Sequence, residues 1–207
     1  MEHQDQRIPK NLACPNCLRH KEQCICSQIE VFKNHTKVVV LQHPQEQLKQ
    51  FNSAKLLTMS LAESALVVGL SWRNHRAVLG EDEQPGNWGV LHLKASSDTS
   101  KSSGKPLEIF RKGKEKIDAA PLKGIIILDG SWKQAKTLWW RNSWLLRLNR
   151  VSLNPSHQSL RNQVSAEKLS TLEAAAMTLR LLGEPETLTN KLLEQYRHLI
   201  IEPNKAR

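Results

Sequence analysis

The 207-residue chain lacks the long apolar runs that place a protein in or across a membrane. No apolar stretch approaches the roughly 18 residues that a transmembrane helix requires. The first residues, MEHQDQRIPK, contain no apolar segment of the kind found in secretory signal peptides. We therefore expect a cytoplasmic protein with no membrane partner.

Glycine-rich phosphate-binding signatures and internal repeats are also missing. Without G-x-G-x-x-G or a P-loop, a dinucleotide-binding Rossmann unit and an NTPase are both disfavoured. Acidic residues are in the minority, because 30 Lys and Arg oppose 20 Asp and Glu and leave a formal net charge of +10. This balance favours a polyanionic partner, nucleic acid before an anionic membrane. The alternative is that the charge only keeps the protein soluble.

Cysteine is scarce, and all four cysteines lie close together as C-x2-C-x6-C-x-C: Cys14, Cys17, Cys24 and Cys26. In a reducing compartment such clustering favours a metal site over disulfides. Four thiolates suit tetrahedral Zn²⁺ in a closed, structural site. We therefore predict that residues 1–35 form an N-terminal zinc-binding segment with four cysteine ligands, and two disulfides or free thiols are the alternatives.

Short apolar runs separated by polar turns predict an α/β domain over residues 36–207, with a mostly parallel sheet flanked by helices. Residues 94–121 are rich in Lys, Ser, Gly and Asp, and we expect a flexible basic loop there, either a flap over the substrate or an insertion. We expect another loop over Ser71–Asn87. The predicted strands are Lys37–Gln42, Ala65–Leu70, Gly89–Leu93, Ile125–Leu128 and Arg150–Leu153. The predicted helices are Phe51–Leu61, one that begins at Ser131, Thr171–Leu182 and Leu188–Ile200.

The stretch Gly124–Arg147 is the centre of this arrangement. Its strand ends at Asp129-Gly130, and Ser131 with Gln134 forms a capping box that starts a helix at once. Ser170 to Glu173 forms a second capping box. Polar residues after parallel strands lie at the carboxyl edge of the sheet, where α/β folds bind ligands. The free N–H groups of two helix N-termini there would suit a carboxylate or another anion.

Further polar and basic residues are expected near this edge. His43 and Glu46 follow the first strand and either position a substrate or are ordinary turn residues. The helix after Ser131 combines cations with tryptophan, which predicts an RNA-facing surface, with simple packing as the alternative. That surface comprises Lys133, Lys136, Trp140, Arg141 and Trp144. The opposite side of the helix, expected to face the core, carries Ala135, Trp139 and Leu146.

Four motifs in this order resemble the DTW-domain family of tRNA-uridine aminocarboxypropyltransferases. They are the cysteine cluster, His43-Pro44-x-Glu46, Leu128 to Trp132, and Leu169 to Ala175, and the resemblance extends from Cys14 to Ile200. The family usually has threonine where this chain has Ser131, a change that keeps both the hydroxyl group and the capping ability.

The resemblance implies a SPOUT-like fold with a C-terminal trefoil knot, which generic connection rules would not suggest. It also implies S-adenosylmethionine bound among loops near Leu91–Ala95, Leu128–Trp132 and Arg161–Leu172. For Ser170 and Thr171 the alternative is a purely structural cap, and for Arg161 it is a phosphate contact or a solvated loop residue. The implied cofactor-binding residues are Leu128, Gly130, Ser131, Arg161, Leu169, Ser170, Thr171 and Leu172.

The implied reaction transfers the 3-amino-3-carboxypropyl group to N3 of a tRNA uridine. We expect Asp129 to act as the base, with its ionised form favoured by the adjacent helix terminus. Alternatively, Asp129 fixes the loop or binds the cofactor's amino group. Trp132 would wall the cofactor pocket or stack on the uracil, unless it packs in the core. We expect a monomer, and the rival functions are a SPOUT-type RNA methyltransferase and a non-catalytic zinc-bearing RNA-binding protein.

Overall fold

The computed structural model describes residues 9, 11–47, 49, 52–93, 105–111, 115–116, 122–154 and 169–201. Its centre is a seven-stranded sheet in the order β2-β1-β6-β3-β7-β4-β5. The first five strands in this order run parallel, and β4 and β5 are antiparallel additions at one side. The strands are β1 (Lys37–Gln42), β2 (Ser64–Val68), β3 (Trp88–Leu93), β4 (Leu107–Arg111), β5 (Glu115–Lys116), β6 (Gly124–Asp129) and β7 (Asn149–Leu153).

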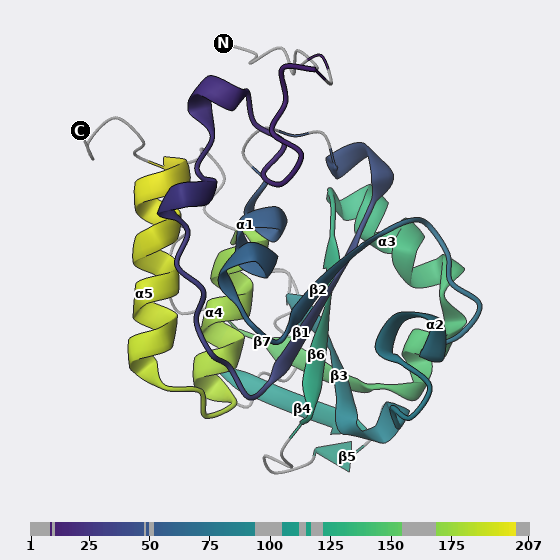
Figure 1. The fold of residues 1–207 in the computed structure, drawn as a ribbon. Coiled ribbons are helices and arrows are strands. Elements are labelled where there is room, and N and C mark those ends of the chain that lie inside the picture. Colours follow the sequence, from purple (N-terminus) through teal and green to yellow (C-terminus); the bar gives the residue numbers. More distant parts are fainter. Residues whose placement is uncertain are drawn as a thin grey trace.

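Helices cover both faces of the sheet, with α1, α4 and α5 on one side and α2 and α3 on the other (Figure 1). The α-helices are α1 (Ser53–Ser60), α2 (Arg76–Leu79), α3 (Trp132–Arg141), α4 (Thr171–Leu181) and α5 (Glu186–Tyr196). A π-helical turn, η6 (Arg197–Ile201), continues α5. The 3-10 turns are η1 (Lys21–Gln23), η2 (Cys26–Gln28), η3 (Pro44–Glu46), η4 (Pro85–Asn87) and η5 (Ser143–Arg147). Across the part of the chain that the structure describes, no helix has the length and apolar character needed to cross a membrane.

The apolar strands follow from this two-sided cover. Successive side chains of a strand point to opposite faces, so a strand buried on both sides is apolar throughout. In β1, Val38 and Val40 pack with Ile125 on the α1/α4/α5 side, whereas Val39 packs with Ile126 on the α3 side. The predicted strand Lys37–Gln42 agrees with β1 residue for residue. The mostly parallel, helix-flanked sheet is therefore confirmed.

Three local predictions were wrong. The expected loop over 94–121 contains β4 and β5, because β4 pairs with β7 and buries Ile109. The expected loop over Ser71–Asn87 contains α2 and η4. The helix after Ser131 was expected to carry Trp144 and Leu146, but it ends at Arg141. Asn142 Nδ2 donates to the Leu138 carbonyl at 2.7 Å just beyond this end.

The expected core-facing side of α3 is confirmed for Trp139, which packs against the core, and is wrong for Leu146. Leu138 is the buried residue of the helix, and Leu146 lies beyond it in η5 and is 66% exposed. The loop predicted at Arg161–Leu172 lies largely outside the described residues. The trefoil knot therefore stays a prediction. The boundary between residues 1–35 and 36–207 also stays a prediction.

Candidate active site at the carboxyl edge of the sheet

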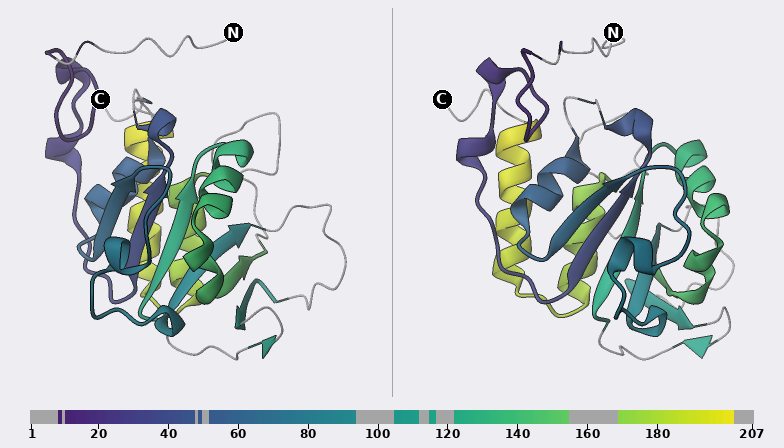
Figure 2. Two further views of the ribbon diagram at one scale, coloured as in Figure 1. Left: turned by 90° about the vertical axis from the view of Figure 1, so that its right-hand side faces the viewer. Right: turned by 45° about the vertical axis from the view of Figure 1, so that its right-hand side comes forward.

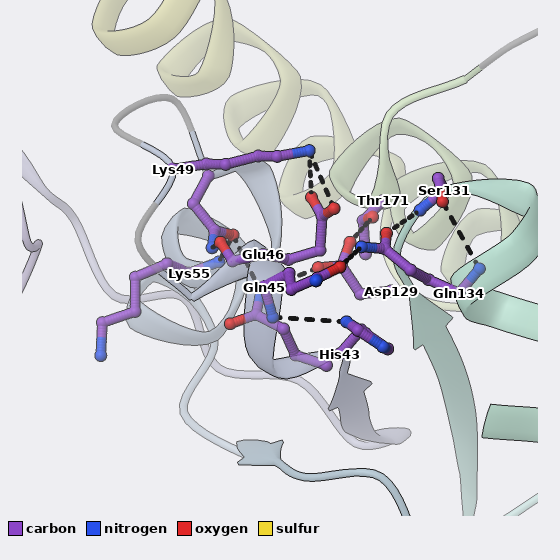
Figure 3. Close-up of polar contacts among 11 residues, drawn as sticks. His43, Gln45, Glu46, Lys49, Lys55, Asp129, Ser131, Gln134 and Thr171 are labelled. Carbon is purple, nitrogen blue, oxygen red and sulfur yellow. Dashed lines mark hydrogen bonds and ion pairs between the residues drawn. The ribbon is translucent and has the colours of Figure 1, made fainter. Parts of the chain in front are cut away.

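Asp129 ends β6 directly beside Gln42, the last residue of β1, and is buried. Gln42 Nε2 donates to Asp129 Oδ2 at 2.8 Å, and Thr171 Oγ1 donates to Asp129 Oδ1. Both carboxyl oxygens therefore accept a hydrogen bond, one from the end of β1 and one from the start of α4. Figure 3 shows Asp129 and Thr171 pointing toward one another across this edge. Residues 42 positions distant in sequence meet here, as the two capped motifs predicted.

The pKa of Asp129 is raised above its ordinary value, mainly because burial penalises the ionised form. The hydrogen bonds from Thr171 and Gln42 lower the pKa, as does the charge of Lys49, while the charge of Glu46 raises it. The expectation that a helix terminus would favour the ionised form was therefore wrong in its net direction. Desolvation outweighs the nearby donors at this position.

Gln42 and Asn52 connect Asp129 to two further elements. Gln42 is fully buried, and its Nε2 also lies 3.3 Å from Asn52 Oδ1. The same Asn52 oxygen accepts from the Lys55 amide at 2.9 Å and so caps α1, while Asn52 Nδ2 donates to the Glu46 carbonyl at 3.0 Å. Our sequence reasoning assigned Gln42 no role. The available signal was a polar residue closing an otherwise apolar strand.

The His43–Glu46 turn lies beside Asp129, as its position after a parallel strand predicted. The His43 amide donates to the Asp129 carbonyl at 3.0 Å. His43 Nδ1 accepts from the Gln45 amide at 3.3 Å and so caps η3. Glu46 pairs with Lys49 Nζ at 2.7 Å (Figure 3). These side chains therefore shape the turn, and a role in substrate binding stays a prediction.

Both predicted capping boxes are present. In α3, the Gln134 amide lies 3.4 Å from Ser131 Oγ, and Gln134 Oε1 accepts from the Ser131 amide at 2.6 Å. In α4, Ser170 Oγ accepts from the Glu173 amide at 3.2 Å, and Glu173 Oε2 accepts from the Ser170 amide at 2.8 Å. The Ser170 hydroxyl thus has the structural role that we gave as its alternative. What these helix starts offer an anion is their first-turn amides.

The remaining predicted cofactor residues contribute mainly backbone. A Cβ atom on Gly130 would lie 2.8 Å from Gln134 Cβ, so this tight turn requires glycine. Leu172 is fully buried, which leaves only its backbone for a ligand. Leu128 and Leu169 are half-buried and pack against the two core clusters. Arg161 lies outside the described residues.

The outer surface of α3 carries the predicted combination of cations and aromatics. Trp132 is 58% and Trp140 71% exposed, which excludes core packing for Trp132. Exposed basic residues surround them: Lys133, Lys136 and Arg141. Trp144 was wrongly included, because it is buried and its Nε1 donates to the Trp72 carbonyl at 3.2 Å.

The four cysteines converge on one point. All four are free, and their Sγ atoms lie within 4.8 Å of one another. The Sγ–Sγ distances are 3.5 Å for Cys14–Cys24, 3.7 Å for Cys14–Cys26 and 3.8 Å for Cys17–Cys24. Zn–S bonds of about 2.3 Å in a tetrahedron place sulfur atoms about 3.8 Å apart. The cysteines are therefore close enough to hold a metal ion, and their spacing suits zinc.

The cysteine segment lies toward the end of the molecule at which β1 and β6 end (Figures 1 and 2). Arg19 donates to the Leu199 carbonyl at 3.0 Å and fastens the segment to η6. A small hollow between the segment and α1 is lined by Cys17, Arg19, Asn52 and Lys55, among others. Because Asn52 also contacts Gln42, the segment supports the helix that borders the site.

Comparison with known proteins identifies the family of the chain. A family model described as DTW domain matches residues 11–202. The chain belongs to the DTW-domain family. The DTW domain is 28% identical over 199 residues to tRNA-uridine aminocarboxypropyltransferase 2 of Macaca fascicularis, covering 90% of this chain and 61% of the relative.

Two other relatives are similar to this DTW domain. It is 30% identical to tRNA-uridine aminocarboxypropyltransferase 2 of Drosophila melanogaster, with 87% of this chain and 65% of the relative covered. It is 27% identical to tRNA-uridine aminocarboxypropyltransferase A of Arabidopsis thaliana, with 71% and 57% covered. The chain thus spans between 57% and 65% of the length of these relatives. No solved structure matches the chain.

Proposed function

We propose that this protein transfers the 3-amino-3-carboxypropyl group of S-adenosylmethionine to N3 of a uridine in tRNA. The names of the relatives support this substrate and reaction. The observation that carries the proposal is a buried carboxyl group, Asp129, held between Gln42 and Thr171 beside two helix N-termini. A base and an anion-binding surface therefore meet at one edge of the sheet.

The donor set at this edge fits the amino-acid arm of S-adenosylmethionine. First-turn amides of α3 and α4 suit its carboxylate, and the turn from Leu128 to Ser131 and residues Leu169 to Leu172 would hold it. When bound, S-adenosylmethionine supplies a carbon made electrophilic by the adjacent sulfonium. Because three carbons share that activation, the role of these residues is to orient the arm toward the uridine.

Asp129 would accept the N3 proton of the uridine during transfer. An ordinary carboxylate is a weak base near neutral pH, and the raised pKa of Asp129 brings the group closer to the range that proton transfer needs. His43 and Glu46, which border Asp129, would position the base of the uridine. In the alternative role, Asp129 binds the amino group of the donor and takes no proton.

The outer surface of α3 would contact tRNA. Trp132, Lys136 and Trp140 recur every four residues and share one side of the helix, and Lys133 and Arg141 flank them. Cations contact phosphates, and exposed indoles stack on unpaired bases. The charge of the whole chain agrees with a polyanionic partner.

The cysteine segment would hold a structural Zn²⁺ through Cys14, Cys17, Cys24 and Cys26, with no open position for catalysis. We further propose a SPOUT-like knotted C-terminal half and a monomeric protein in the cytoplasm. Size-exclusion chromatography with light scattering tests the oligomeric state, and metal analysis of the purified protein tests the zinc.

The function is tested by mass spectrometry of nucleosides from tRNA incubated with the protein and S-adenosylmethionine. We expect a uridine that carries an added aminocarboxypropyl group, and we expect Asp129→Asn to abolish it while the variant stays folded. Asp82→Asn, at an exposed aspartate, is the matched control and keeps full activity. Full activity of Asp129→Asn would eliminate the base role. Absence of any product with the unmodified protein would overturn the proposed reaction.

A further inference from the structure

Gln42 is a buried polar residue that follows four buried apolar residues in the same strand. It is 0% exposed, and the four residues before it in β1 are buried valines and a leucine. Burying an amide group costs free energy unless the group is hydrogen-bonded. The presence of glutamine here is therefore explained by what its amide contacts.

The two ends of the Gln42 amide are treated differently. Nε2 donates to Asp129 Oδ2 at 2.8 Å and to Asn52 Oδ1 at 3.3 Å. Oε1 is buried and has no hydrogen-bond partner among the described residues. A residue that served only packing would be expected to satisfy both ends or to be apolar. The donor end of the Gln42 amide is therefore hydrogen-bonded at the site, whereas the acceptor end is buried without a partner among the described residues.

We propose that Gln42 is a positioning residue: its amide holds the carboxyl group of Asp129 against the end of β1 and, as a donor, favours the carboxylate form that accepts the proton. The part of this inference that concerns proton transfer rests on the function proposed above. The effect of Gln42 on Asp129 is measurable without any transfer reaction, so the two proposals fail separately.

The groups that act on Asp129 come from every neighbouring element. Gln42 of β1 and Thr171 of α4 are neutral donors that favour the carboxylate, and Lys49 does the same through its charge. Burial and the charge of Glu46 in η3 oppose them. Glu46 and Lys49 pair with each other at 2.7 Å, and their charges act on Asp129 in opposite directions. Gln42 and Thr171 are the two residues whose side chains bond directly to the Asp129 carboxyl group.

Gln42→Met tests the role, because methionine has a similar volume and no donor. Losing one hydrogen bond to a carboxylate should move the acid limb of the kcat/KM profile upward by about one pH unit. Activity would then be lost at low pH and largely recovered at higher pH. Carbon-13 NMR of the aspartate carboxyl groups, with Asp129 assigned through Asp129→Asn, should show the same displacement without substrate.

Asn149 provides a matched control at the amino end of β7. It is 2% exposed, its Nδ2 donates to the carbonyls of Gly86 and Trp88 at 2.8 and 2.9 Å, and its Oδ1 has no partner among the described residues. Asn149→Leu therefore removes a buried amide of the same kind. It should lower stability to a similar extent and leave both the pH profile and the Asp129 titration unchanged.

A second variant, Gln42→Glu, keeps the size of the residue and places another carboxyl group against Asp129. Two adjacent carboxyl groups share one proton and titrate as a pair, so the single Asp129 titration should split into two steps, the second at a higher pH than in the wild type. This variant decides the matter if Gln42→Met does not fold. An unchanged Asp129 titration in the folded variants, or an equal displacement in Asn149→Leu, would overturn the inference. A wild-type protein without transfer activity would overturn the proposed function alone, because the NMR titration still reports on Gln42.

Discussion

Asp129→Asn should make the protein more stable at neutral pH while it removes activity. Burial raises the pKa of Asp129, so the folded protein binds the proton of this group more tightly than the unfolded chain does. Above the folded-state pKa the native protein therefore contains a buried charge that lowers its free energy of unfolding. Asparagine has nearly the same shape and carries no charge.

Two opposing contributions set the size of the effect. Asparagine keeps one acceptor oxygen, so the bond from Gln42 becomes a neutral one, and the Thr171 hydroxyl must turn to accept from the new amide nitrogen. Each change costs about 1 kcal/mol. The raised pKa shows that desolvation exceeds what these bonds contribute to the charged form. Each unit by which the folded pKa exceeds the unfolded value adds about 1.4 kcal/mol to the advantage of a neutral group.

The sign of the pH dependence follows. The wild-type protein gains stability as the pH falls through the raised pKa, because Asp129 then becomes protonated, whereas the variant gains nothing from this site. The advantage of Asp129→Asn should therefore be largest near neutral pH and should shrink as the pH falls toward about 4. Groups such as Glu83 and Glu184 titrate in both proteins and cancel in the difference.

Urea unfolding of both proteins across this pH range measures the effect, with Asp82→Asn as the exposed control that should match the wild type. A variant less stable than the wild type at neutral pH would refute the reasoning. So would a stability difference that stays constant with pH.

Three further predictions concern other parts of the molecule. Removal of metal by a chelator, or Cys24→Ser, should unfold the cysteine segment and lower the thermal midpoint, whereas Ser27→Ala should leave it unchanged, as circular dichroism can check. Trp140→Ala should weaken binding of unpaired RNA by about 1–3 kcal/mol in fluorescence anisotropy, whereas an exposed lysine of α5, changed in Lys191→Ala, should matter little. Glu184 accepts from the Thr36 amide at 2.6 Å, and the backbone hydrogen bonds hold its pKa below the ordinary value despite burial. Its stabilising effect is therefore present at neutral pH and lost as the pH falls through that lowered pKa, so Glu184→Gln should destabilise the protein by about 1–3 kcal/mol near neutral pH and less in acid.

Local signals in the sequence were sufficient for the two helix starts. A capping box involves residues three apart, so Ser131 with Gln134 and Ser170 with Glu173 are recognisable without a structure. The first strand was equally accessible, because burial on both sides leaves a continuous apolar run. The convergence of the cysteines also followed from their spacing.

The rest depended on contacts between distant segments. The pKa of Asp129 is set by burial under α4 and by Gln42, neither of which is visible in the neighbouring sequence. β4 was missed because charged residues, Glu108 and Arg111, interrupt its apolar run and its partner, β7, lies about 40 residues further along the chain. Trp144 was assigned to the surface of a continued helix. Because α3 ends before it, Trp144 lies in η5 and is buried.

The most direct test of the proposed reaction uses S-adenosylmethionine labelled separately in its methyl group and in its methionine backbone. After incubation with the protein, label from the backbone should appear in the uridine of tRNA, and label from the methyl group should not. Transfer of the methyl label alone would contradict the account and identify an RNA methyltransferase. Binding of tRNA without transfer of either label would instead identify a non-catalytic RNA-binding protein.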